Sequence, residues 1–430
     1  MRRSRDFTVS ILFLSGDFPP GDGRAPRPSG SLSFATTVVG PDPLFNTSGP
    51  KVGSAPTVTL RLPEGVSAGH RRRRGRDQGR DRGGGARRAA RPYRKGPEKG
   101  STARHASRQD GAVDVPATGV RLPWQDVPEE IRRAVEDRLG APVARAVTQT
   151  GGFSPGAAAR LTLADGRRAF VKAVGPEPNP LSADIYRAEA RISAALPEDV
   201  PAPRLLASFD SGGWVALLFE DVDGRPPAAP WRADELARVL DALDRLAAVL
   251  TPSPIPAPPA QERLDGQLRG WRLLAEARDA GEDDLAGLDP WAARHLDALA
   301  GLEEGWPEAI RGESLVHGDI RADNLLLTPG EVVVVDWPWA FTGAPWFDLL
   351  QLLPSVRMQG GPPAEEVFTA HPVGRAADPE AVTAVLAALA GYFVRQARQP
   401  DPPGLPTLRA FQRAQGRTAL EWLRTRTGWA

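Results

Sequence analysis

The alternation of apolar and polar residues changes character near residue 116 of this 430-residue chain. Beyond that point, apolar positions recur at helical spacing between Pro128 and Gly140, which predicts an opening helix that the glycine ends. The next segments have the length and composition of strands. The glycine-containing turns between them predict an antiparallel meander over residues 144–150, 157–164 and 167–174.

A second helix and two more strands are predicted downstream of the meander, over residues 182–196, 205–209 and 214–220. Beyond Gly224 most of the long segments have helical periodicity. A β-rich part followed by an α-rich part predicts an α+β fold of two lobes. The small lobe would span residues 116–220 and the helical lobe residues 221–430.

Residues 1–115 show no such pattern and are predicted to form a disordered basic arm. Residues 1–110 hold 22 basic and 9 acidic side chains, against 32 basic and 44 acidic in the remainder, so the net charge of +1 hides two opposite parts. All 11 tryptophans lie between Trp124 and Trp429. An arm rich in Gly, Pro and Arg cannot bury enough apolar surface to offset its chain entropy.

Three interpretations of the arm stay open on the sequence alone. The arm is a tail that binds nucleic acid electrostatically through residues 70–99, a solvated linker without a partner, or a stretch that the host does not translate because the true start lies near residue 113. The absence of methionine between Met1 and Met358 favours the third. We expect no nucleic-acid partner elsewhere in the chain.

The chain contains no cysteine, which excludes disulfide scaffolds, cysteine-ligated metal clusters and thiol nucleophiles. The longest apolar run near the N-terminus, residues 11–14, is far shorter than the roughly 7–15 residues of a signal-peptide core, and no stretch approaches the roughly 20 apolar residues that span a bilayer. We therefore expect a soluble, cytoplasmic protein without a membrane partner.

The most informative segment contains the pattern H-G-D-x-x-x-x-N, followed by two apolar runs around Pro329-Gly330. Such runs predict a tight hairpin. Its register places Asn324 opposite Val335, with Asp336 one step beyond. Because cross-strand neighbours are roughly 5 Å apart, an amide oxygen and a carboxylate would converge at the open end of the hairpin. Magnesium takes oxygen ligands of this kind together with substrate phosphates, so the pair predicts a magnesium site.

Asp319 lies in the loop before Asn324, where a carboxylate could accept a proton from a hydroxyl that attacks a phosphoryl group. Taken singly, these residues are ordinary loop residues, because Asp and Asn favour turns. The motif combined with a second carboxylate at the end of a predicted hairpin favours a functional site. His317 has no reacting partner in the pattern and is expected to brace the loop.

The third strand of the meander places a lysine among apolar residues. Period-2 alternation puts Lys172 on the face of Phe170 and Val174, where an ammonium group needs an anion. Glu189 interrupts the apolar stripe of the second helix. Pairing of the two, with Lys172 also contacting phosphates, accounts for both. The alternatives are that the lysine extends past the sheet edge into solvent and that Glu189 pairs with Arg160.

Together these residues resemble the aminoglycoside phosphotransferase family, which comprises antibiotic and small-molecule kinases with a protein-kinase-like fold. The matching segments are Phe170-Val171-Lys172, Glu189, His317-Gly318-Asp319 with Asn324, Asp336-Trp337-Pro338-Trp339-Ala340, and Asp348. The resemblance covers about residues 116–425 and says little about the substrate. It implies a bilobal protein-kinase-like fold with a nucleotide between the lobes.

The resemblance implies a role for each matching residue. Asp319 would be the catalytic base, and Asn324 and Asp336 would be the magnesium ligands. Lys172 would contact the phosphates of ATP, with Glu189 orienting it.

Two further positions follow from the resemblance. Asp348 would support the catalytic loop, and the backbone around Glu220 and Val222 would form the hinge that holds adenine. The loop at residues 151–156 departs from the G-x-G-x-x-G spacing of protein kinases, and a plain hairpin loop would look much the same. Gly152 and Ser154 are candidates for nucleotide contact. ATP is the expected nucleotide, with GTP as the alternative.

The sequence therefore predicts an enzyme that uses ATP and Mg²⁺ to move the γ-phosphoryl group to a hydroxyl of a small molecule, either an aminoglycoside-like compound or another metabolite. Two alternatives belong to other classes. One is a catalytically silent kinase-like protein that binds nucleotide without turnover. The other is a nucleic-acid-binding protein that acts through the basic arm.

Overall fold

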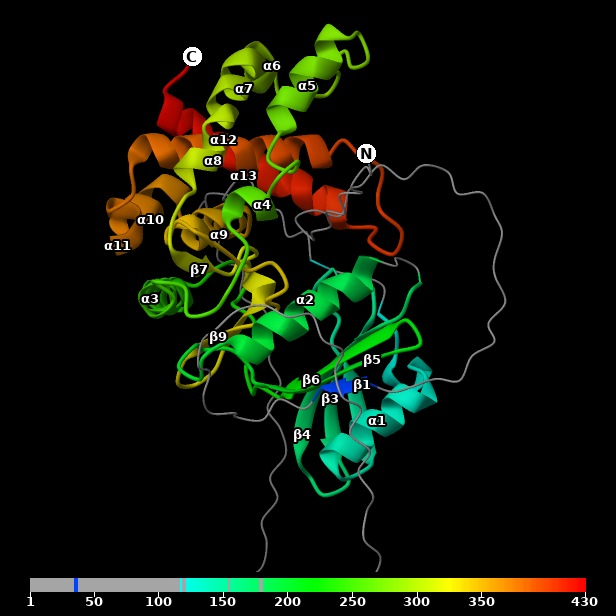
Figure 1. Cartoon of the computed structure of the whole chain (residues 1–430). Coiled ribbons are helices and arrows are strands. Elements are labelled where there is room, and N and C mark those ends of the chain that lie inside the picture. The colour runs from blue at the N-terminus through cyan, green and yellow to red at the C-terminus, as the bar shows by residue number, and fades with distance from the viewer. Residues whose placement is uncertain (1–34, 38–116, 118–120, 154, 178–180) are drawn as a thin grey trace, which may run out of the picture. The chain divides into compact units, whose positions relative to one another are not determined.

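The computed structural model describes residues 35–37, 117, 121–153, 155–177 and 181–430 (Figure 1). All of these residues belong to one compact unit. Most of the predicted arm, including residues 70–99 and the candidate start near residue 113, lies outside the described residues. Among the described residues, no helix combines the length and the apolar character needed to cross a bilayer.

The small lobe is built on a six-stranded antiparallel sheet with the strand order β1-β5-β6-β4-β3-β2. The strands are β1 (Ala35–Thr37), β2 (Val143–Thr148), β3 (Ala157–Leu163), β4 (Arg168–Val174), β5 (Leu205–Ser211) and β6 (Trp214–Glu220). The sequence pattern predicted no element in the arm, whereas the structure places β1 there, paired with β5. An open strand edge offers backbone partners to any extended segment, so this pairing needs no apolar periodicity.

Two helices cover opposite faces of this sheet, and a 3₁₀ turn precedes the first; they are η1 (Trp124–Asp126), α1 (Glu129–Leu139) and α2 (Leu181–Ala195). Val171 of β4 packs in one apolar cluster with Ile131 of α1. Val174, three residues later, packs in another cluster with Tyr186 of α2. Alternate β4 residues therefore face different helices, which points Lys172 toward α2.

The predicted bounds of these elements agree with the structure within about two residues. The run predicted at 205–209 extends to Ser211, and the helix predicted at 182–196 begins one residue earlier. Gly140 ends α1 in the left-handed conformation with φ of 70°. This is the conformation that glycine adopts without steric cost at a helix C-terminus.

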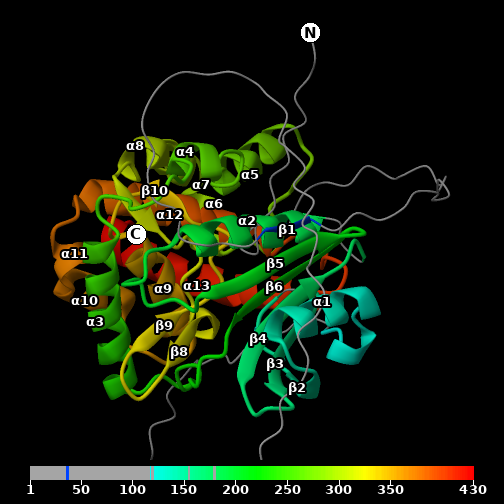
Figure 2. The ribbon, with the colours of Figure 1, turned by 60° about the horizontal axis from the view of Figure 1, so that its bottom comes forward.

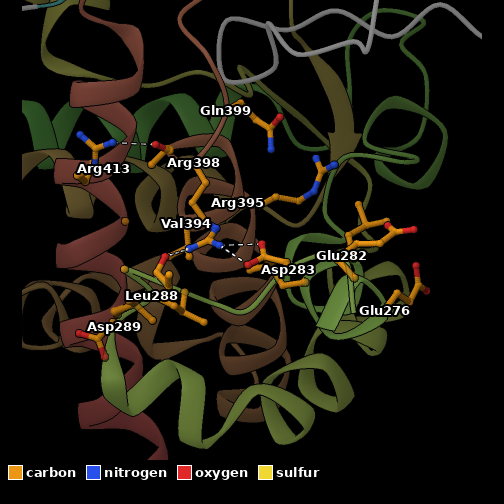
Figure 3. Close-up of a pocket in the computed structure, with 18 of the residues that line it drawn as sticks. Glu276, Glu282, Asp283, Leu288, Asp289, Val394, Arg395, Arg398, Gln399 and Arg413 are labelled. Atoms are coloured by element: carbon orange, nitrogen blue, oxygen red, sulfur yellow. Dashed lines mark hydrogen bonds and ion pairs between the residues drawn. The ribbon is translucent and has the colours of Figure 1, made fainter. Parts of the chain in front are cut away.

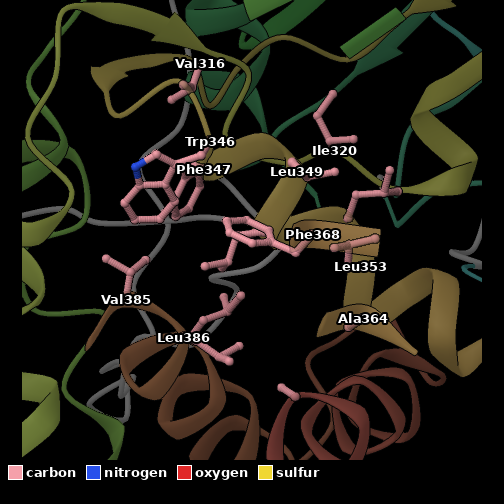
Figure 4. Packing of buried hydrophobic residues seen from close by; sticks show 14 of the residues in the cluster. Val316, Ile320, Trp346, Phe347, Leu349, Leu353, Ala364, Phe368, Val385 and Leu386 are labelled. Carbon is pink, nitrogen blue, oxygen red and sulfur yellow. The ribbon is translucent and has the colours of Figure 1, made fainter. Parts of the chain in front are cut away.

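The large lobe is mainly helical. Its helices are α3 (Ala233–Val249), α4 (Ala260–Arg263), α5 (Gly270–Asp279), α6 (Pro290–Arg294), α7 (Leu296–Glu304), α8 (Trp306–Ala309), η2 (Ala322–Asn324), α9 (Phe347–Met358), α10 (Ala364–Ala370), α11 (Pro372–Arg375), α12 (Pro379–Gln396) and α13 (Leu408–Thr427). One large apolar cluster joins α9 to α10 and α12, and Figure 4 shows Phe368 packed between Leu353 and Leu386. This core gives the site a rigid base.

Two small antiparallel sheets of two strands each lie within the helical lobe. They are formed by β7 (Ser314–Val316) with β10 (Phe341–Gly343) and by β8 (Leu325–Leu327) with β9 (Val332–Val334). The β8–β9 hairpin lies between α3 and the small-lobe sheet (Figures 1 and 2). The H-G-D motif follows β7, so these small sheets bring the motif to the side of the helical lobe that faces the small-lobe sheet.

Candidate active site

The loop that carries the H-G-D motif is fixed to the start of α9. Asp348 accepts hydrogen bonds from the backbone N–H groups of His317 at 2.8 Å and Gly318 at 3.0 Å. Gln351, three residues further along α9, bonds to the peptide groups on both sides of Asp319, at 2.8 and 2.7 Å. Burial raises the pKa of Asp348 to about 6, and its two N–H partners oppose that shift. Asp348 thus bonds to the backbone of the H-G-D loop, as expected for a residue that supports this loop.

The backbone conformation and the close packing at position 318 require a glycine there. Its φ is 78°, a left-handed value that disfavours residues with a side chain. A Cβ atom there would lie 2.8 Å from the carbonyl oxygen of Trp339 and 2.9 Å from the ring of Phe341. The loop therefore packs directly against the segment that follows Asp336.

The His317 ring is fully buried and bonded on both sides. Its Nδ1 accepts the backbone N–H of Asp319 at 3.1 Å, and its Nε2 donates to the carbonyl of Val335 at 3.0 Å. Its edge also packs on Trp337, with ring centroids 4.7 Å apart. Burial lowers the pKa of His317 to about 4, so the ring is neutral near pH 7. This geometry fits the bracing position predicted for His317.

Asp319 is fully buried, and its two carboxylate oxygens have different partners. Nη1 of Arg321 lies 2.5 Å from Oδ1, and the amide nitrogen of Asn324 lies 3.3 Å from Oδ2. Burial raises the pKa of Asp319 to about 7, Arg321 opposes that shift, and the nearby Asp323 and Asp336 add to it. A carboxylate with a pKa near neutral is well suited to exchange protons.

The backbone places both Asn324 and Asp336 at the open end of the β8–β9 hairpin, in the predicted register. Leu325 pairs with Val334, and the N–H of Val335 donates to the carbonyl of Asn324 at 3.0 Å. Asp336 follows with φ of 71°. Residues with a side chain seldom adopt this conformation, and those that do are concentrated at functional sites.

The Asn324 and Asp336 side chains offer oxygen atoms to a hard cation. Both hydrogen bonds of the Asn324 side chain are donated by its amide nitrogen, which leaves the amide oxygen as the atom that can ligate. The described part of the chain has no group of three or more His, Cys, Asp or Glu side chains placed to hold a metal. A cation here would need further oxygens from phosphates, which is how Mg²⁺ is bound with nucleotides.

Lys172 and Glu189 form the predicted pair, and Asp336 joins them. Lys172 Nζ lies 2.6 Å from Oε2 of Glu189 and 2.6 Å from Oδ1 of Asp336. Arg160, the alternative partner considered for Glu189, pairs with Asp221 instead, with 3.3 Å between its Nε and Oδ1 of Asp221. The Lys172–Asp336 contact joins the small lobe to the large lobe at the end of the hairpin.

Burial and ion pairing shift the pKa values of Lys172, Glu189 and Asp336 in opposite directions. Burial lowers the pKa of Lys172, but Asp336 and Glu189 outweigh it and leave the pKa raised. Burial raises the pKa of Glu189 against the opposing effect of Lys172. For Asp336, burial would raise the pKa, but Lys172 and Arg321 hold it below its ordinary value. A lysine that stays charged can contact phosphates.

The predicted hinge follows β6. The Glu220 side chain points to the surface, where it pairs with Arg204. The carbonyl of Val222 accepts hydrogen bonds from the N–H of Gly224 and from Arg160, both at 2.9 Å. The N–H of Val222 bonds to no residue in the described part of the chain. It is therefore a donor that this hinge segment can offer to a nucleotide base.

The loop after β2 differs from a simple phosphate-binding loop. Gly152 has φ of 83°, and its N–H donates to the carbonyl of Ala117 at 2.9 Å. Ser154 lies outside the described residues. Phe153 is buried and packs edge-on against Phe411 of α13, with ring centroids 5.2 Å apart. The nucleotide contacts predicted for Gly152 and Ser154 stay predictions.

Sequence reasoning missed Arg321, Gln351 and the aromatic pair Phe153–Phe411. The available signal was the placement of Arg321 between Asp319 and Asp323, because a cation flanked by two carboxylates at this spacing can bond to both. Gln351 gave no comparable signal, since a glutamine in an apolar helix has many uses.

A cavity of about 1090 Å³ lies elsewhere in the helical lobe, between α5, the loop after it, α12 and α13 (Figure 3). Arg398 crosses it to bond both carboxylate oxygens of Asp283, at 2.6 and 2.7 Å. None of the motif residues lines this cavity. The candidate active site is therefore the convergence of the H-G-D loop, the hairpin end and Lys172.

Comparison with family models and known proteins shows which proteins this chain is similar to. A model of the phosphotransferase enzyme family matches residues 150–400. An aminoglycoside 3'-phosphotransferase of Streptomyces fradiae is 30% identical over 186 residues, which are 36% of this chain and 62% of that protein. One of Streptomyces ribosidificus is 32% identical over 141 residues, 30% and 48% of the two chains. The matches thus span less than two thirds of either relative.

Among solved structures, a choline kinase from Streptococcus pneumoniae is similar to this chain with a TM-score of 0.45 and 13% identity. The match covers 69% of this chain and 100% of that one.

Proposed function

Because the chain belongs to the phosphotransferase enzyme family, we propose that it transfers the γ-phosphoryl group of ATP to a hydroxyl group of a small molecule. One observation carries the proposal. A fully buried Asp319 with Asn324 in the same loop, Asp336 after β9, and the Lys172–Glu189 pair converge from four separate segments of the chain. We place this reaction in the cytoplasm, where ATP is available.

Asp319 is the proposed catalytic base. Arg321 holds Oδ1, so Oδ2 is the atom that can accept the proton of the attacking hydroxyl. The hydroxyl oxygen then forms a bond to the γ-phosphorus as the bond to the β-phosphate oxygen breaks, and ADP leaves. Such a reaction needs positioning and charge neutralisation, and it involves no covalent enzyme intermediate.

Asn324 and Asp336 are the proposed ligands of Mg²⁺. An amide oxygen and a carboxylate at one strand end, with phosphate oxygens completing the shell, fit the ligands that Mg²⁺ prefers. When bound, the ion neutralises charge on the β- and γ-phosphates. Asp336 must then turn from Lys172 toward the metal.

Lys172 is the proposed contact to the ATP phosphates. Glu189 holds its ammonium group at 2.6 Å and keeps it in place when Asp336 is released. The N–H of Val222 is the proposed donor to adenine. Contact of Gly152 with the phosphates requires its N–H to leave Ala117.

A panel assay tests the function. The full-length chain would be incubated with ATP, Mg²⁺ and one acceptor at a time, chosen from aminoglycosides, macrolides, choline, homoserine and sugars. We expect one class to gain a phosphoryl group by mass spectrometry, with ADP formed in equal amount and no product without Mg²⁺. Magnesium-dependent ATP binding without turnover on any hydroxyl would contradict the proposal and favour a silent nucleotide-binding protein.

A further inference from the structure

Arg321 is the one cation in ion-pair contact with Asp319 in the described part of the chain. All three nitrogens of its guanidinium bond to a carboxylate. Nη1 lies 2.5 Å from Oδ1 of Asp319, while Nε and Nη2 bond the two carboxylate oxygens of Asp323 at 3.0 and 2.8 Å. Only 4% of the Arg321 side chain is exposed, so water does not weaken these contacts.

Two aromatic rings pack beside the same guanidinium. Its central carbon lies 5.7 Å from the ring centroid of Phe153 and 5.8 Å from that of Phe411. The two rings come from different lobes and contact each other edge-on. Carboxylates on one side and rings on the other restrict rotation of the guanidinium.

Asp319 needs such a restraint because its remaining side-chain contact is weak. The amide nitrogen of Asn324 is 3.3 Å from Oδ2, at the long end of hydrogen bonding. The well-placed bonds of Asn324 and Gln351 go to backbone groups of the loop instead. The loop backbone is therefore held by α9, whereas the carboxylate itself is held by Arg321.

We propose that Arg321 is a positioning residue that fixes the Asp319 carboxylate with Oδ1 occupied and Oδ2 facing the acceptor, and that Phe153 and Phe411 hold the guanidinium in the plane this requires. The inference rests on the proposed function, since it assigns a role within phosphoryl transfer. It predicts a loss in the chemical step, because the described hydrogen bonds of the Arg321 side chain go to Asp319 and Asp323 and not to the proposed ATP-binding residues.

Three variants of the full-length chain test the proposal. Arg321→Met should lower kcat by at least ~10² with KM and Kd for ATP within ~3-fold of wild type, because a misplaced base costs rate more than binding. Arg321→Lys keeps the charge but loses the fork, and should recover part of that loss, to about 10-fold below wild type. Phe411→Leu should lower kcat in the same direction by a smaller factor.

A matched control separates positioning from stability. Arg426 is comparably buried, with 7% of its side chain exposed, and it pairs with Glu365, of which 30% is exposed, far along α13 from the site. Arg426→Met should lower the melting temperature but keep kcat within ~3-fold of wild type. An equal loss of kcat in Arg426→Met, or kcat near wild type in Arg321→Met, would overturn the proposal.

Failure of the proposed function is distinguished by two more measurements. If no acceptor is phosphorylated, release of γ-phosphate from ATP to water serves as the readout for the same variants. If wild type shows neither reaction, the proposed function fails, and crystal structures of wild type and Arg321→Met decide the positioning role. An Asp319 side chain that turns away only in the variant supports it, and an unchanged side chain refutes it.

Discussion

Four carboxylates, those of Asp319, Asp323, Glu189 and Asp336, lie in the candidate active site, and two cations compensate them. Arg321 binds Asp319 and Asp323. Lys172 binds Glu189 and Asp336. Removing one partner of a buried pair typically costs about 3–5 kcal/mol, because it leaves an uncompensated charge. Single substitutions here therefore act on neighbouring groups as well as on the residue that is changed.

Asp336→Ala should abolish turnover and weaken nucleotide binding that depends on Mg²⁺. The reason is that the proposed metal site would lose its carboxylate ligand, which would leave the β- and γ-phosphates poorly neutralised. Calorimetric titration with ATP, with and without Mg²⁺, measures the effect. If Mg²⁺ tightens ATP binding equally in wild type and variant, Asp336 is not a ligand.

His317 predicts a pH dependence of stability. Its pKa is lowered from 6.5 to about 4 in the fold, so below pH 6.5 the unfolded chain takes up a proton that the folded chain refuses until about pH 4. Stability should fall as pH falls through this window, by about 3 kcal/mol in total. Urea unfolding of wild type and His317→Gln at several pH values measures the slope. Equal slopes in the two proteins would contradict the neutral, buried histidine.

At the scale of elements, α9 holds the catalytic loop through its first turns. Asp348→Ala leaves the buried N–H groups of His317 and Gly318 without their acceptor. We expect a loss of about 3 kcal/mol and a melting temperature roughly 6–12 °C lower. Asp378→Ala removes an exposed N-cap of α12 and should cost only about 1 kcal/mol. Similar melting temperatures for both variants would show that Asp348 does not secure the loop.

The elements differ in how far the sequence predicts them. Strands β2 to β6 have alternation or turn residues that predict them, and the turn of the β8–β9 hairpin also gives its register, as the pairing of Leu325 with Val334 shows. In contrast, β7 and β10 are three residues each, too short to carry a periodic signal, and all three residues of β7 are buried. These two strands form because the tertiary structure around them brings their segments together.

The contacts within the site also differ in how far the sequence predicts them. Lys172 and Glu189 could be paired from sequence because each is a charge on an otherwise apolar face. The flanking aspartates indicate that Arg321 can bond to both, but its packing beside Phe153 and Phe411 could not be predicted, because these rings are about 170 and 90 residues away in the sequence. Tertiary packing between distant segments has no local signal.

At the scale of the whole molecule, the arm is predicted to be dispensable for the catalytic domain. A shortened chain beginning at Val113 loses β1, a three-residue edge strand, and keeps every residue of the proposed site. We expect the melting temperature to stay within a few degrees of the full chain, corresponding to about 1 kcal/mol, and kinase activity to persist. Failure of the shortened chain to fold would show that the arm contributes to the domain.

Asp319 is the group that would accept the proton in phosphoryl transfer, and its substitution tests the proposed reaction most directly. Single-turnover transfer from γ-labelled ATP should be compared between wild type, Asp319→Asn and the surface variant Asp378→Asn. We predict that Asp319→Asn lowers the rate at least ~10²-fold while ATP affinity stays nearly unchanged, and that Asp378→Asn behaves as wild type. An Asp319→Asn variant that transfers phosphate at close to the wild-type rate would contradict the central claim.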